Sequence, residues 1–86
     1  MNYLQFDLGQ LSSGDVVEVT LTNAANVKLM NSSNFSSYRN GRRHNFYGGL
    51  AKATPLQLQI PSSGQWHVAV DMAGLSGSTN ASVRVL

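Results

Sequence analysis

Apolar and polar residues alternate with period two along most of this chain. The alternation is clearest in four segments, 4–8, 16–21, 56–60 and 66–72. Such alternation is typical of antiparallel strands that bury one face and expose the other. Shorter apolar segments at 27–30 and 82–86 add two more expected strands.

Clusters of glycine, serine and asparagine separate these segments. They are "SSGD" at 12–15, "NAAN" at 23–26, "PSSG" at 61–64 and "AGLSGST" at 73–79. These residue types favour turns, because they accept positive φ or form local side-chain to backbone hydrogen bonds. The pattern therefore predicts an all-β fold, an antiparallel β-sandwich of about seven to eight short strands. We expect one domain over residues 1–86, either alone or as the N-terminal module of a longer protein.

The 66–72 segment carries the only tryptophan and one of the two histidines. Trp66 lies on the apolar side of the alternation, so we expect it to be buried in the core. His67 and Asp71 lie on the polar side, which we expect to face solvent. Four residues of strand span about 13 Å, so these two side chains should not meet. A catalytic Ser-His-Asp set would depend on tertiary contacts that the sequence does not reveal.

The segment "SSYRNGRRHNFYGG" at 36–49 predicts a β-hairpin. Asn40-Gly41 is the strongest two-residue signal for a type I′ turn, which needs positive φ at both central positions. Such a turn would place Arg39 opposite Arg42 on paired strands. "YGG" at 47–49 lacks the spacing of a phosphate-binding loop, and we interpret it as a bend or bulge.

Composition narrows the function classes. The 86 residues contain no cysteine, and the four acids are scattered, so we expect neither a metal site, nor a cofactor, nor an enzyme. The net charge is only +2, but Arg39, Arg42, Arg43 and Lys52 lie within a segment that contains no acid. No apolar run approaches the roughly 20 residues of a membrane span, and a signal peptide is not evident. We therefore expect a cytoplasmic protein.

The hairpin is the candidate working surface. The candidate ligand-binding residues are Tyr38, Arg39, Arg42, Arg43, His44 and Tyr47. Guanidinium groups bind phosphate or carboxylate, and aromatic faces stack on bases or sugars. The expected function is a non-enzymatic binding or sensing module for a protein or a small anionic ligand. The alternative is weak, sequence-independent nucleic-acid or phosphate binding, and a purely protective role of charge on edge strands also stays open. A homo-oligomer is compatible with this pattern, and no membrane partner is expected.

Four segments carry a family resemblance. They are "LMNSSNF" at 29–35, "YGG" at 47–49, "P..G.WHV" at 61–68 and "VDM.GL.G" at 70–77. Together they resemble the bacterial family known as domain of unknown function 1883. The resemblance implies a small β-sandwich that occurs alone or N-terminal to a TIR domain. It also implies regulation of a fused or associated TIR-type effector, and it supplies no catalytic motif.

Overall fold

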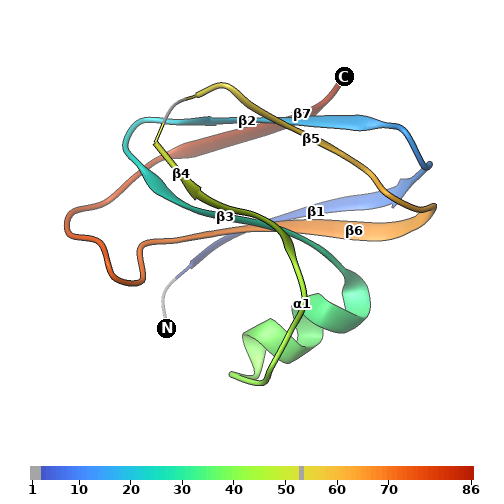
Figure 1. The fold of residues 1–86 in the computed structure, drawn as a ribbon, viewed down its shortest axis with the longest axis horizontal. Coiled ribbons are helices and arrows are strands. Elements are labelled where there is room, and N and C mark those ends of the chain that lie inside the picture. The colour runs from blue at the N-terminus through green and yellow to red at the C-terminus, as the bar shows by residue number, and fades with distance from the viewer. Residues whose placement is uncertain (1–2, 53) are drawn as a thin grey trace.

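The computed structural model describes residues 3–52 and 54–86 and shows two packed antiparallel sheets (Figure 1). The elements are β1 Tyr3–Leu11, β2 Val16–Leu21, β3 Ala25–Asn31, α1 Ser32–Arg39, β4 Tyr47–Ala51, β5 Leu56–Gln59, β6 Gly64–Asp71 and β7 Ala81–Val85. The predicted all-β sandwich is confirmed, and so are the four strands expected from the alternation and the two expected from shorter apolar segments.

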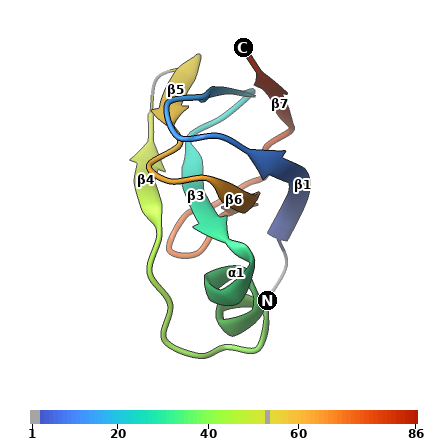
Figure 2. The same ribbon diagram turned by 90° about the vertical axis from the view of Figure 1, so that its right-hand side faces the viewer.

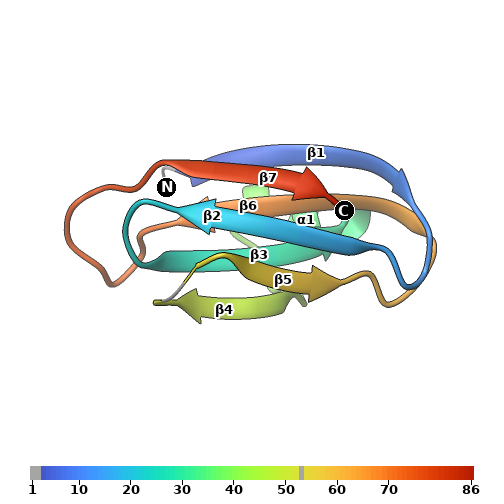
Figure 3. The same cartoon turned by 90° about the horizontal axis from the view of Figure 1, so that it is seen from above.

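One sheet has four strands in the order β1-β6-β3-β4, and the other has three in the order β5-β2-β7. Viewed from above, the strands of the two layers run roughly along the same direction (Figure 3). The ladder between β3 and β4 ends at the pair Leu29–Tyr47, whereas the ladder between β3 and β6 continues to Asn31–Trp66. The last two residues of β3 therefore have a strand partner on one side only.

The core fills the space between the sheets with the apolar side of each strand. Its buried members are Leu11, Val17, Val19, Leu21, Ala25, Val27, Leu29, Ala51, Ile60, Trp66, Val68 and Val70. The predicted burial of Trp66 is confirmed, since only 4% of this residue is exposed.

The predicted hairpin around Asn40-Gly41 is wrong, because Ser32–Arg39 forms the helix α1. Gly41 does adopt positive φ (+71°), as expected, but it does so immediately after the helix. Its N–H donates to Tyr38 O at 3.1 Å, and the N–H of Arg42 donates to Ser37 O at 2.8 Å. This pair of bonds is a Schellman motif, which satisfies the last carbonyls of the helix.

α1 covers the outer face of the four-stranded sheet, on the side away from β2, β5 and β7 (Figures 1 and 2). Phe35 and Tyr38 form its buried side and pack on Met30, Ala69 and Tyr3. β6 is consequently buried on both faces. The prediction that His67 and Asp71 face solvent is therefore wrong, because the helix covers the polar side of the alternation.

Gly48 and Gly49 lie in β4, paired in regular register with Lys28 and Val27. The predicted bend or bulge is therefore absent at this point of the described ladder. Both glycines have positive φ, +115° and +144°. At Gly48, a Cβ atom would also collide with the backbone oxygen of Val27. Close backbone approach is thus the reason for glycine at this position.

Candidate functional site

The N-terminus of α1 is built by asparagine. Asn31 is the N-cap residue, and its Oδ1 accepts hydrogen bonds from the backbone N–H of Asn34 at 2.9 Å and from Asn34 Nδ2 at 3.0 Å. An N-cap side chain satisfies a backbone donor that has no partner inside the helix. The cap also holds the side chains of Asn31 and Asn34 in one orientation.

A buried polar network anchors the middle of the helix to the sheet. The hydroxyl of Tyr38 donates to Asp71 Oδ2 at 2.6 Å, while Asp71 Oδ1 accepts from Asn26 Nδ2 at 2.8 Å and from the N–H of Ala73 at 3.1 Å. Burial alone would raise the pKa of Asp71, but these hydrogen bonds and the charge of Lys28 hold it below its ordinary value. Burial and the neighbouring carboxylate raise the pKa of Tyr38. At neutral pH, Asp71 is therefore ionised and Tyr38 is a neutral donor.

Lys28 positions the loop that follows α1. Its Nζ lies 5.0 Å from the centroid of the Tyr38 ring and 4.7 Å from that of the Phe46 ring. It also lies 3.3 Å from His44 Nε2, and His44 Nδ1 lies 3.0 Å from the carbonyl oxygen of Arg42. Because a carbonyl only accepts, His44 Nδ1 carries the proton and Nε2 accepts from Lys28. These contacts tie residues 42–46 to β3.

His67 links the start of α1 to β6. Its Nε2 lies 2.9 Å from Ser32 Oγ, and its ring stacks on Phe35 with centroids 4.7 Å apart. Asp7 Oδ1 is 3.9 Å from His67 Nδ1, beyond hydrogen-bond distance, and it accepts the N–H of Gly9 instead. The fold thus brings a serine, a histidine and an aspartate near one another, but the aspartate does not orient the imidazole as it would in a catalytic triad.

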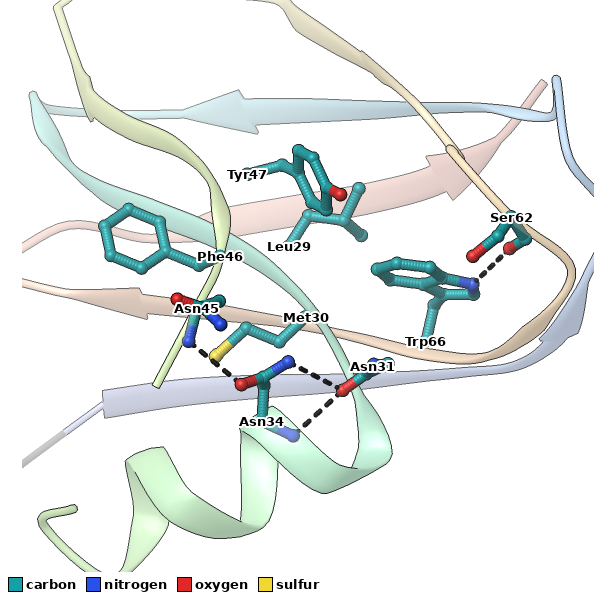
Figure 4. Close-up of a pocket in the computed structure, with 9 residues that line it drawn as sticks. All are labelled: Leu29, Met30, Asn31, Asn34, Asn45, Phe46, Tyr47, Ser62 and Trp66. Carbon is teal, nitrogen blue, oxygen red and sulfur yellow. Dashed lines mark hydrogen bonds between the residues drawn. The ribbon is translucent and has the colours of Figure 1, made fainter. Parts of the chain in front are cut away.

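A pocket of about 350 Å³ lies where β4 turns away from β3. Its lining comes from the end of β3, the first turn of α1, the loop before β4 with the first residue of β4, and the segment that leads into β6 with the start of β6. We call it the aromatic–amide pocket, and its residues are Leu29, Met30, Asn31, Asn34, Asn45, Phe46, Tyr47, Ser62 and Trp66 (Figure 4).

One wall of the pocket is aromatic. Tyr47 is 53% exposed, and its ring centroid lies 6.2 Å from that of Trp66, with the two ring planes inclined at 58°. The indole N–H of Trp66 donates to the carbonyl oxygen of Ser62 at 2.9 Å, which fixes the ring. Phe46 also lines the pocket and is 41% exposed, but its ring lies on the other side of the chain from the Tyr47 ring, against Lys28 (Figure 4).

The opposite wall consists of amides. Asn34 Oδ1 accepts the backbone N–H of Asn45 at 2.9 Å, and Asn34 Nδ2 donates to Asn31, so three asparagines form a connected row (Figure 4). The Nδ2 of Asn31, the carboxamide of Asn45 and the hydroxyl of Ser62 make no side-chain hydrogen bond to another described residue. These groups remain free to bind a ligand, while the row behind them is held in place.

The structure separates the six residues that the sequence singled out. Arg39, Arg42 and Arg43, which we call the basic cluster, are exposed at the end of α1 and in the following loop. Tyr38 was predicted as part of that surface, but it lies on the sheet-facing side of α1, where it is buried and its hydroxyl binds Asp71. His44 is half-buried against Lys28. Of the six, only Tyr47 lines the aromatic–amide pocket.

Sequence reasoning missed the asparagines, Ser62 and Trp66 as residues that line this pocket. A usable signal was present, because "LMNSSNF", "YGG" and the segment 61–68 all contribute lining residues. These are three of the four segments that carry the family resemblance. Their convergence at one place becomes visible only in the fold.

The described residues contain no group of three or more histidine or acidic side chains placed to hold a metal ion. Their one helix, α1, is too short to cross a membrane.

Residues 1–86 match the family described as "Domain of unknown function (DUF1883)". The chain therefore belongs to this family. No curated protein and no solved structure matches it.

Proposed function

We propose that this member of the domain of unknown function 1883 family is a non-enzymatic binding module, and that the aromatic–amide pocket is its ligand site. The observation that carries the proposal is the convergence of three aromatic residues and three asparagines from separate segments on one recess. Ligand pockets combine apolar walls with a few fixed polar groups in this way. The asparagine row and the bonded indole supply the fixed groups.

The chemistry of the lining supports binding without catalysis. None of the nine residues carries a carboxylate, an imidazole or an amine. General acid–base catalysis relies mainly on such groups. The amides and the hydroxyl can orient a ligand through hydrogen bonds, and the rings can cover its apolar surface.

The test is a screen of small neutral and charged compounds against the ¹⁵N-labelled chain. We expect hits to shift the amide resonances of pocket residues and the indole N–H resonance of Trp66, the only tryptophan. Tyr47→Ala should remove these shifts. Leu50→Ala is the matched control, because Leu50 is equally exposed on the same strand (50%) but does not line the pocket. Hits that leave the pocket unchanged and cluster elsewhere would refute the assignment.

A second candidate is phosphate binding at the basic cluster. No carboxylate of residues 3–52 and 54–86 lies within ion-pair distance of Arg39, Arg42 or Arg43. Three guanidinium groups without an ion-pair partner among the described residues would give a modest affinity for nucleic acid that falls steeply with salt. A salt titration of oligonucleotide binding, with the triple Arg→Ala variant as control, tests this alternative. Regulation of a TIR-type effector stays a prediction from the family resemblance, and the full gene sequence would test it.

A further inference from the structure

We propose that the ligand of the aromatic–amide pocket is a neutral carbohydrate, bound through one or two pyranose units. This inference rests on the proposed function of the pocket as a binding site and names the class of ligand that it would take.

The absence of charge in the described lining is the first argument. All nine lining residues have side chains that are uncharged at neutral pH. A phosphate, carboxylate or ammonium group placed among them would lose hydration without gaining an opposite charge. Lys28 is not a lining residue, and its Nζ lies against the rings of Tyr38 and Phe46 and 3.3 Å from His44 Nε2. The lining therefore favours a neutral ligand.

The arrangement of the two walls is the second argument. A pyranose has an apolar face of C–H groups and an edge of hydroxyl groups, each of which can both donate and accept. The ring of Tyr47, which is 53% exposed, presents an aromatic surface on which a C–H face can pack. The free carboxamide of Asn45 offers a donor and an acceptor, and Asn31 Nδ2 and the Ser62 hydroxyl lie along the same pocket. An amphipathic sugar ring matches this opposition of walls.

The geometry of the rings argues against a nucleobase, which is the other flat neutral ligand. Tyr47 and Trp66 are inclined at 58° with centroids 6.2 Å apart, so they form a wedge. A planar base would gain stacking on one ring only, whereas base-binding sites stack bases on open aromatic faces. Trp66 is only 4% exposed and therefore offers little ring surface for stacking. The volume, about 350 Å³, is at the small end of the range of ligand pockets, roughly 300–1,000 Å³, and suits a small saccharide.

The experiment titrates the ¹⁵N-labelled 86-residue chain with four kinds of compound: neutral mono- and disaccharides, an acyclic polyol, uncharged nucleosides, and inorganic phosphate. Concentrations reach the high millimolar range, where even a weakly bound single sugar approaches saturation. The acyclic polyol controls for hydroxyl content without a rigid C–H face. We expect at least one cyclic sugar to give saturable shifts at Asn31, Asn45, Tyr47 and the Trp66 indole, and the polyol to give none.

Variants then assign the contacts. Tyr47→Ala should weaken sugar binding about tenfold or more, as expected for loss of one stacking contact at ~1.4 kcal/mol per factor of ten. Asn45→Ala should weaken it in the same direction, and Leu50→Ala should leave it unchanged.

Every other result of the titration overturns either the carbohydrate class, the binding site or both. If nucleosides shift the pocket and sugars do not, the carbohydrate class is wrong and the binding site stands. If phosphate alone binds and shifts only residues near Arg42 and Arg43, both the class and the site are wrong. Equal shifts from the acyclic polyol and the sugars would show nonspecific solvation and would also overturn the carbohydrate class. If no compound in the panel shifts a pocket residue, the carbohydrate class and the binding site both fail.

Discussion

Replacing Tyr38 by phenylalanine tests how the helix beside the pocket is anchored. The substitution removes one hydroxyl and leaves the buried Asp71 carboxylate without its 2.6 Å hydrogen bond. A hydrogen bond to a charged group contributes about 1.5–3 kcal/mol, and the remaining bonds from Asn26 and Ala73 should keep the variant folded. With a urea m-value of about 1 kcal/mol/M for a chain of this size, the unfolding midpoint should fall by roughly 1.5–3 M.

Two controls show whether the carboxylate charge is the cause. In an Asp71→Asn background, Tyr38→Phe should cost only about 1 kcal/mol, because the remaining acceptor is neutral. The folded-state pKa of Asp71 lies below its ordinary value of 3.8. The ionised carboxylate therefore contributes to the free energy of unfolding above that value, and this contribution is lost as pH falls through the folded pKa. Removing the hydroxyl raises that folded pKa. The stability difference between wild type and variant should therefore be constant near neutral pH and shrink below about pH 4. An equal cost in both backgrounds, or a difference that is unchanged in acid, would refute the reasoning.

Four further predictions concern the backbone, the core and alkaline pH. Gly48→Ala should destabilise the fold by more than about 2 kcal/mol in urea unfolding, because it combines positive φ with a collision at Val27 O; a near-neutral effect would contradict the close approach. Gly41→Ala should destabilise the fold by about 1–2 kcal/mol, because an alanine Cβ would meet no atom there but would be strained by the left-handed backbone conformation. A stabilised variant would rule out the Schellman motif. Trp66→Ala should cost about 3–5 kcal/mol, and wild-type fluorescence with the maximum of a fully hydrated indole would contradict its burial. Because the pKa of Tyr38 is raised in the folded state, the neutral phenol contributes its full free energy to folding below the ordinary pKa of 10.0, and this contribution is lost as pH rises through the folded pKa. Urea unfolding at alkaline pH should therefore show this loss of stability in the wild type and not in Tyr38→Phe.

The strands were predictable because one face of each packs on the opposite sheet. Alternation in 16–21 and 56–60 marks side chains that point into the sandwich, and this pattern needs no knowledge of the partner strand. The alternation gave a wrong prediction for the outer face of β6, which it indicated to be exposed to solvent. His67 and Asp71 look like solvent-facing residues in the sequence, but a segment more than twenty residues earlier covers them.

The helix was missed because its local signals are ambiguous. "SSNFSSYR" is rich in serine and asparagine, which have low helix propensity, and only Phe35 and Tyr38 form its buried side. Gly41 adopts the positive φ that a type I′ turn requires, but the same conformation ends a helix. Asn31 as N-cap together with Gly41 after the C-cap would have marked an eight-residue helix.

The candidate site was only partly predictable, because its residues come from four segments. Tyr47 was selected for its aromatic ring, but the sequence does not show that β4 leaves the end of β3 uncovered. The arginines attracted attention by their charge, whereas the pocket is built from neutral amides whose role depends on their hydrogen bonds to one another. Such a constellation has no charge or spacing signature along the chain.

The most direct test of the central assignment is a crystal structure of the chain with the tightest-binding compound from the screen. The account predicts ligand density in the aromatic–amide pocket, packed on Tyr47 and hydrogen-bonded to Asn31 or Asn45. Density at the basic cluster, beside Arg42 and Arg43, with an empty aromatic–amide pocket, would contradict it.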